Sequence, residues 1–109
     1  MLDSVEKRSS IAGGSEERFT LRLYIAGQTP KSQAAVVNLR RLCEEYLAGR
    51  YDLEVVDLIL NPEKARTDQI LAIPTLIRSL PIPIARIIGD LSDTEQVLLG
   101  LNIQRKAMS

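Results

Sequence analysis

The sequence predicts one small α/β domain, and three observations lead to this prediction. Residues 19–26 alternate between apolar and polar side chains, which is typical of a half-buried strand. A helical pattern over 29–48 and a second strand pattern over 51–60 follow, as in a βαβ unit with a right-handed crossover. The apolar segment 70–83 is interrupted by three prolines, so it cannot form one continuous helix or one central strand.

The first predicted strand, over 19–26, has two faces of different polarity. Because successive side chains of a strand point to opposite faces, the apolar set is expected to face the core and the polar set to lie on the opposite face. The apolar face carries Phe19, Leu21, Leu23 and Ile25, and the polar face carries Thr20, Arg22 and Tyr24.

A helix is predicted after the short turn 27–31. Thr29 is placed to act as the N-cap, with Pro30 at the first helical position, where a missing N–H costs nothing. Gly49 is expected to stop the helix at its C-terminal end. One stripe of the helix is apolar and should face the core. It comprises Val36, Leu39, Leu42 or Cys43, and Tyr46.

The chain continues with a second strand and a shorter helix. Residues 51–60 begin by alternating and end almost continuously apolar, as expected for a strand that runs into the interior. Asn61 and Pro62 repeat the cap-and-proline start of a helix. This helix is predicted from Pro62 to about Leu71, ending before Pro74.

Two short strands and a last helix complete the predicted domain. The segments 75–80 and 84–89 are predicted to pair as a hairpin, with 79–83 as the turn. Ser92 and Glu95 have the spacing of a capping box in front of an apolar helical pattern, which favours a final helix.

This order of elements, βαβ followed by a helix, a hairpin and a last helix, is similar to that of thioredoxin-like domains. We therefore predict a thioredoxin-like domain over 19–104. Residues 1–18 are rich in Ser, Gly and charged residues without periodicity, so they are predicted to form a disordered tail. Residues 105–109 are expected to fray.

Composition excludes several classes of function. The 14 basic and 14 acidic residues give a formal net charge of zero, and no basic block exceeds two residues, so nucleic-acid binding is not expected. No uninterrupted apolar segment approaches the roughly 20 residues that a membrane-spanning helix needs. Cys43 is the only cysteine and no secretory signal is present, which favours the reducing cytoplasm.

The sequence contains no recognisable catalytic constellation, so we predict no catalytic, cofactor-binding or metal-binding residues. It has no histidine, which excludes histidine bases and mixed Cys/His zinc sites. Thioredoxin-like enzymes place a reactive thiol in the segment that corresponds to 26–32, which has no cysteine here. Cys43 is expected to pack in the core. Two alternatives remain: a glutathione-dependent or other thiol-handling enzyme using Thr29 or Ser32, and a structural oligomer.

Five blocks of the sequence together resemble the KaiB family of circadian-clock-type proteins, in matching order and spacing from about Thr20 to Leu101. The blocks are LYIAGQTPKS over 23–32, Asp57 with LNP over 60–62, ILAIPTL over 70–76, LPIP over 80–83, and RIIGDLS over 86–92.

The resemblance implies an adaptor without enzymatic activity and without a cofactor. Its main partner would be a KaiC-like hexameric ATPase, and KaiA or sensor kinases would be further partners. The resting form would assemble as a homotetramer, or as a dimer. The resemblance leaves open whether the role is in a daily clock or in stress adaptation.

The resemblance also assigns two binding surfaces. The KaiC-facing surface includes the segment leading into the first proline of 70–83, and the surface for KaiA is an exposed edge strand, which can add a partner strand by backbone pairing. Gln69 stands where clock members often have lysine, and Glu54 replaces a common positive charge. The first surface comprises Gln69, Ile73, Pro74 and Arg78, and the second comprises Tyr51, Asp52 and Glu54.

Members of the family can adopt two folds in their C-terminal half, a thioredoxin-like fold and a resting fold. Because X-Pro bonds isomerise slowly, we hypothesise that Pro74, Pro81 and Pro83 contribute to the barrier between the folds. The family's switch-sensitive pair maps onto Gly100 and Asn102, and clock members carry aspartate at the second position. The alternative is that Gly100 helps to end the last helix and that Asn102 is simply solvated.

Overall fold

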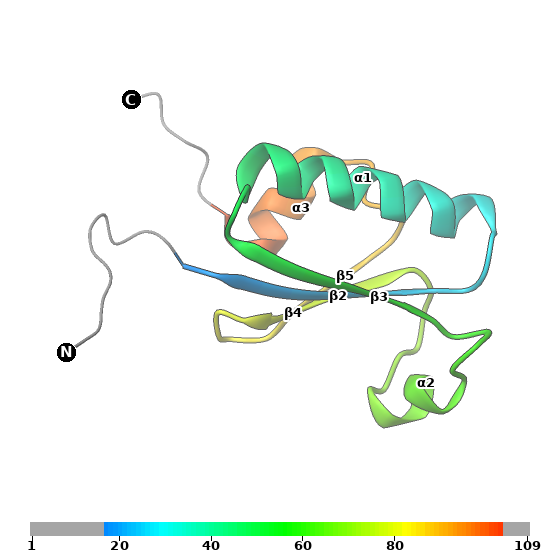
Figure 1. Ribbon diagram of the computed structural model, residues 1–109. Helices are drawn as coiled ribbons and strands as arrows, with labels where there is room; N and C mark the ends of the chain where they lie inside the picture. The colour runs from blue at the N-terminus through cyan, green and yellow to red at the C-terminus, as the bar shows by residue number, and fades with distance from the viewer. Residues whose placement is uncertain (1–16, 104–109) are drawn as a thin grey trace, which may run out of the picture.

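A mixed four-stranded sheet with the strand order β3–β2–β4–β5 organises the computed structural model, which describes residues 17–103 (Figure 1). The central strand β2 (Phe19–Ile25) is parallel to the edge strand β3 (Tyr51–Asp57) and antiparallel to β4 (Thr75–Leu80). The other edge is β5 (Ala85–Ile88), which pairs antiparallel with β4. The predicted α/β order, including the hairpin, is therefore confirmed.

The helices lie on both sides of the sheet, but they cover its faces unequally (Figure 1). Helices α1 (Pro30–Tyr46) and α3 (Thr94–Leu101) cover one face, which we call the closed face. The short helix α2 (Glu63–Thr67) lies below one end of the other face, which we call the open face. The N-cap of α1 is Thr29, as predicted: its hydroxyl accepts a hydrogen bond from the Ser32 N–H at 3.3 Å.

The main core lies between the closed face and the two longer helices. Alternation in β2 directs its odd-numbered residues into this core, and the apolar stripe of α1 meets them there, as predicted. Buried members are Phe19, Leu21 and Leu23 of β2, Ala35, Leu39, Leu42 and Cys43 of α1, Leu76 of β4, and Val97, Leu98 and Leu101 of α3.

A second, smaller apolar cluster lies under α2 on the open face. It consists of Tyr24, Val56, Leu58 and Ile70. The alternation in β2 places Tyr24 on the face opposite the main core, as predicted, yet its side chain is buried there. The cluster buries Tyr24 because α2 and the segment after it fold back over this end of the sheet.

Three predicted boundaries need correction, each for a local reason. β3 ends at Asp57 and not at residue 60, because the Asp57 carboxylate turns the chain by accepting from the N–H groups of Gly27 (3.0 Å) and Ile59 (2.9 Å). Ile59 and Leu60 are exposed and do not enter the interior. The last helix is capped by Asp93 and not by Ser92: the Asp93 carboxylate accepts from the Gln96 N–H at 3.2 Å.

The third correction concerns α2, which ends at Thr67 and not near Leu71. Gln69 has a φ of 56°, in the left-handed region, and this conformation ends the helix. The N–H of Ile70 then donates to the Ala65 carbonyl at 2.8 Å, which closes the helix end.

Most of the predicted tail (1–16) and the predicted frayed end (with 104) lie outside the described residues. Arg18, at the end of the predicted tail, is described and contacts β3. Within 17–103, no helix has the length and apolar character needed to cross a bilayer. The peptide bonds before the three prolines of 70–83 are cis.

Candidate functional site

One end of the sheet, which we call the loop end (residues 58–61 and 68–74), exposes large aliphatic side chains. The C-terminal end of β3 and the N-terminal end of β4 meet there because β3 is parallel and β4 antiparallel to β2. Such exposed apolar residues mark interaction surfaces when they gather in one region. They are Ile59 (67% exposed), Leu60 (75%), Leu71 (95%) and Ile73 (42%).

Three of the residues predicted to face KaiC lie together at the loop end. Gln69 and Ile73 are exposed, whereas the Pro74 ring is buried. The Pro74 carbonyl accepts from the Gly89 N–H at 3.0 Å, and the Thr75 hydroxyl donates to the Ala72 carbonyl at 2.6 Å. These bonds attach the exposed segment to the sheet, so Pro74 anchors this surface more than it contributes to it.

The fourth of these residues, Arg78, does not lie with the other three. Its side chain points into the closed face and is only 4% exposed. Its guanidinium donates to the carbonyls of Leu101, at the end of α3, and Pro83, in the hairpin turn. In this conformation Arg78 ties the hairpin to α3, and its burial removes it from the predicted contact surface.

The residues predicted for the second surface lie on β3, which is an edge strand as expected for that role. The Tyr51 hydroxyl donates to Glu44 of α1 at 2.6 Å, and this bond raises the pKa of Tyr51. Asp52 accepts two bonds from Arg18, at 2.9 and 3.0 Å, and these bonds hold the pKa of Asp52 below its ordinary value. Glu54 accepts from Arg22 at 2.9 Å.

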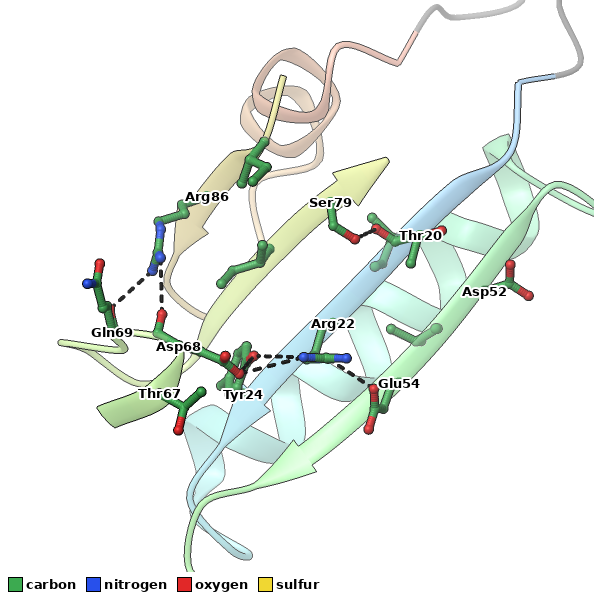
Figure 2. Close-up of a pocket in the computed structure, with 14 residues that line it drawn as sticks. Thr20, Arg22, Tyr24, Asp52, Glu54, Thr67, Asp68, Gln69, Ser79 and Arg86 are labelled. Carbon is green, nitrogen blue, oxygen red and sulfur yellow. Dashed lines mark hydrogen bonds and ion pairs between the residues drawn. The ribbon is translucent and has the colours of Figure 1, made fainter. Parts of the chain in front are cut away.

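A groove of about 570 Å³ runs across the open face between β3 and β5 (Figure 2). Arg22 of β2 lies between two carboxylates in it, with Glu54 at 2.9 Å and Asp68 at 3.6 Å. The Tyr24 hydroxyl donates to the same Asp68 carboxylate. Burial is the main reason that the pKa of Tyr24 is raised, and the bond to Asp68 acts in the same direction.

The sequence interpretation missed this network of Arg22, Tyr24 and Asp68, together with Arg86 at the β5 side of the groove. The available signal was a tyrosine on the polar face of an alternating strand, because a partly buried Tyr hydroxyl usually has a hydrogen-bond partner. That signal would not have identified Asp68, which lies 44 residues away in the chain.

The predicted switch-sensitive pair lies at the C-terminal end of α3. Gly100 is inside the helix and not at its end, and a Cβ atom built there would lie 2.7 Å from Cδ1 of Ile87 in β5. Asn102, with a φ of 58°, is the residue that ends the helix. Its left-handed conformation lets the Ile103 N–H donate to the Leu98 carbonyl at 2.9 Å. Gly100 therefore permits close packing on β5.

The described residues include no cluster of His, Cys, Asp and Glu that could hold a metal ion. Cys43 is fully buried, and burial raises the pKa of its thiol to about 12. Ser32, at the start of α1, is also buried, and its hydroxyl accepts from the Ala26 N–H at 3.0 Å. Both side chains are buried in the fold and are not accessible to a ligand. The accessible groups described above are the aliphatic side chains of the loop end and the polar side chains of the open face.

The sequence of this chain matches that of a known protein family. The family model described as the KaiB domain matches residues 22–103. The circadian clock protein KaiB3 of Synechocystis is 49% identical over 86 residues, which cover 79% of this chain and 84% of that protein. The circadian clock oscillator protein KaiB of Prochlorococcus marinus MIT 9313 is 51% identical over 85 residues, covering 78% of this chain and 71% of the relative.

Solved structures with low sequence identity share the fold. The N-terminal domain of SasA from Synechococcus elongatus superposes with a TM-score of 0.64 at 21% identity, covering 93% of this chain and all of that domain. Mitochondrial thioredoxin 3 of Saccharomyces cerevisiae superposes with a TM-score of 0.63 at 16% identity, covering 80% of each chain. The predicted thioredoxin-like fold is thus confirmed.

Proposed function

We propose, since the chain belongs to the KaiB family, that it is a clock-type regulator that acts by binding and not by catalysis. Its partner would be a KaiC-family hexameric ATPase, and docking on the ATPase ring would change the phosphorylation or signalling state of that ring. The relatives named above are circadian clock proteins, which supports the regulatory role. We place this activity in the cytoplasm, where the single cysteine stays reduced.

The observation that carries this proposal is the exposure of Leu71 and its neighbours at the loop end. An aliphatic side chain that is 95% exposed gains little from its own fold, but it would be stabilised by burial against a partner. Gln69 and Ile73 flank it on the same segment, and Pro74 fixes where that segment joins β4. We assign this segment to the ATPase.

The β3 edge would serve a second partner, either KaiA or a sensor kinase. Backbone pairing there could extend the sheet by one strand. Asp52 and Glu54 project from this edge onto the open face, and each is already paired with an arginine of its own chain. A partner would therefore be selected mainly by backbone bonds and by contact with Tyr51.

Regulation in this family would involve two conformations, of which the structure is the thioredoxin-like one. If the ATPase ring binds the thioredoxin-like form more tightly than it binds the resting oligomer, it would increase the population of the thioredoxin-like form. The size of this population shift is limited by the difference between the ring's two affinities. We propose that the resting form is a homotetramer or a dimer, and that the bound form is a single subunit.

Docking is tested by measuring the affinity of the labelled chain for the KaiC-like ATPase hexamer of the same organism. Leu71→Ser should weaken binding by at least about tenfold, because it removes the most exposed aliphatic side chain of the proposed interface. Leu99→Ser is the matched control: Leu99 is also an exposed leucine, but it lies on α3, away from the loop end.

The proposal would be supported if the Leu99→Ser variant binds the hexamer as tightly as the wild-type chain does and the Leu71→Ser variant binds it weakly. Equal affinities for the two variants would remove the loop end from the interface. Failure of the wild-type chain to bind the hexamer at all, in a monomeric or an oligomeric fraction, would contradict the proposed function and favour a structural oligomer.

A further inference from the structure

Helix α2 packs too little to fix the position of the loop end by itself. It has five residues, none of them is buried, and Ala65 alone among them packs, partly buried, against the small apolar cluster. A helix of this length is not stable by itself, because so few backbone hydrogen bonds cannot offset the cost of ordering the chain. Contacts from outside the helix must therefore position the segment that follows it.

The first set of contacts comes from β2 and converges on the Asp68 side chain. The carboxylate accepts the Tyr24 hydroxyl, and Nη1 of Arg22 lies 3.6 Å from it. Arg22 is held in turn by Glu54 of β3, at 2.9 Å. Figure 2 shows these side chains pointing toward one another across the open face. Asp68 is thus fixed from the centre of the sheet.

The second set comes from β5 and converges on the backbone of the same segment. The two terminal nitrogens of Arg86 donate to consecutive carbonyls, those of Asp68 (3.1 Å) and Gln69 (3.3 Å) (Figure 2). A planar guanidinium can bridge two acceptors in this way, whereas an ammonium group cannot do so in the same fixed geometry. Its positive charge also lies just after the C-terminus of α2, where the helix dipole favours a cation.

Both sets of contacts reach the loop end at Asp68 and Gln69, just before its exposed aliphatic residues Leu71 and Ile73. Asp68 and Gln69 are the last residues before Ile70, whose side chain is buried, and Leu71 follows. An orientation imposed at residues 68–70 therefore determines where Leu71 and Ile73 point.

We propose that Tyr24, Asp68 and Arg86 are positioning residues for the loop end. Together they hold the segment 69–73 in the orientation in which it docks, and they act through that segment. The part of this inference that concerns docking rests on the proposed function, whereas the part that concerns the order of the free segment does not.

Two variants test the proposal while preserving the packing of the sheet. Tyr24→Phe removes the hydroxyl that binds Asp68 and keeps the buried ring. Arg86→Gln removes the guanidinium that bridges the two carbonyls. Arg86→Lys keeps the positive charge but lacks the planar guanidinium. Arg66→Gln is the matched control, because it removes a positive charge from an exposed residue of α2.

Amide hydrogen exchange of the free chain is the first measurement. Tyr24→Phe and Arg86→Gln should each accelerate exchange of the amides of 68–73 by about five- to tenfold, as expected when one hydrogen-bonded contact of a loop is lost. Exchange in β2 and β4 should not change, Arg86→Lys should fall between Arg86→Gln and wild type, and Arg66→Gln should match wild type. A general loss of stability would instead accelerate exchange in the strands as well.

The second measurement is affinity for the ATPase hexamer, which should fall by about three- to tenfold in the two variants and not in Arg66→Gln. If exchange of 68–73 and affinity both equal those of wild type, the positioning role is wrong. If exchange accelerates while wild-type chain and variants alike fail to bind the hexamer, the proposed function is wrong and the positioning of the free segment still holds. If exchange accelerates and affinity is unchanged, the segment is positioned but its orientation is not needed for docking, which overturns the part of the inference that concerns docking.

Discussion

The two faces of the sheet are held by different kinds of interaction. The closed face packs apolar side chains of β2 and β4 against α1 and α3, in a continuous core. The open face has a small apolar cluster under α2, and beyond it a groove crossed by Arg22, Tyr24 and Asp68. The same strand supplies both faces, because its side chains alternate.

This difference separates stability from positioning. Apolar burial is strong but non-directional, so the closed face should provide most of the free energy of folding. Hydrogen bonds and ion pairs at partly exposed sites contribute little net energy, but they are directional. The open face is therefore suited to orienting the loop end, and changes there should alter binding more than stability.

Neighbouring residues of β4 test this separation most directly. Leu76 is fully buried in the main core, and Ile77 is partly buried on the open face. Leu76→Ala should lower the free energy of unfolding by about 2–5 kcal/mol, because it leaves a cavity in a closed core. Ile77→Ala should lower it by only about 1 kcal/mol, because solvent can fill the space. Urea unfolding measures both, and equal losses would mean that the two faces contribute alike.

Thiol reactivity provides a second comparison of the faces. Burial raises the pKa of Cys43 to about 12, so its reactive thiolate is disfavoured in the folded state. At pH 8 a disulfide reagent should modify Cys43 at least about 100-fold more slowly than a cysteine placed on the open face by Ser79→Cys in a Cys43→Ser background. Comparable rates would show that the closed face opens readily.

The pH dependence of stability follows from the same shift. The folded-state pKa of Cys43 is above the ordinary value, so its contribution to stability is complete below about pH 8.5–9 and declines as the pH rises toward 12. Wild-type chain should therefore lose stability in this range relative to the Cys43→Ser variant, whose hydroxyl does not titrate. Urea unfolding between pH 7 and pH 10.5 measures the difference, and parallel curves would contradict it.

The smallest effect is expected at the end of α3, where the closed face meets the edge strand β5. Asn102 is in the left-handed conformation, which a glycine adopts easily and an alanine only at a cost. Asn102→Ala should lower the free energy of unfolding by about 1 kcal/mol, and Asn102→Gly should leave it within about 0.5 kcal/mol of wild type. Thermal unfolding of the pair measures this, and equal melting temperatures would show that the left-handed cap is unimportant.

The parts of the fold that sequence predicted well have local causes. The faces of β2 follow from alternation, the start of α1 from Thr29 and Pro30, and the β4–β5 hairpin from strand patterns separated by prolines. The spacing of Ser92 and Glu95 predicts Ser92 as the cap, but Asp93, next to it, is an equally good capping residue and is the one that caps α3. Patterns of this kind cannot choose between adjacent candidates.

The parts that sequence predicted poorly depend on contacts between distant segments. The family resemblance predicts Arg78 on a binding surface, but its side chain is buried because the end of α3 and the hairpin turn offer carbonyls to its guanidinium. Ile59 and Leu60 read as the end of a buried strand, but Asp57 turns the chain by binding Gly27. Similarly, nothing near Asp68 in the sequence indicates that Tyr24 lies beside it.

The identity and order of the elements, the side of β2 that faces the main core, and the family resemblance could all be read from the sequence, because they depend on neighbours in the chain and on the order and spacing of short blocks within it. Only the folded arrangement shows which polar residues are buried, which aliphatic residues remain exposed at the loop end, and which side chains contact the segment that leads into them. The physical reason is that burial and hydrogen-bond partnership belong to pairs of segments, and only folding brings those segments together.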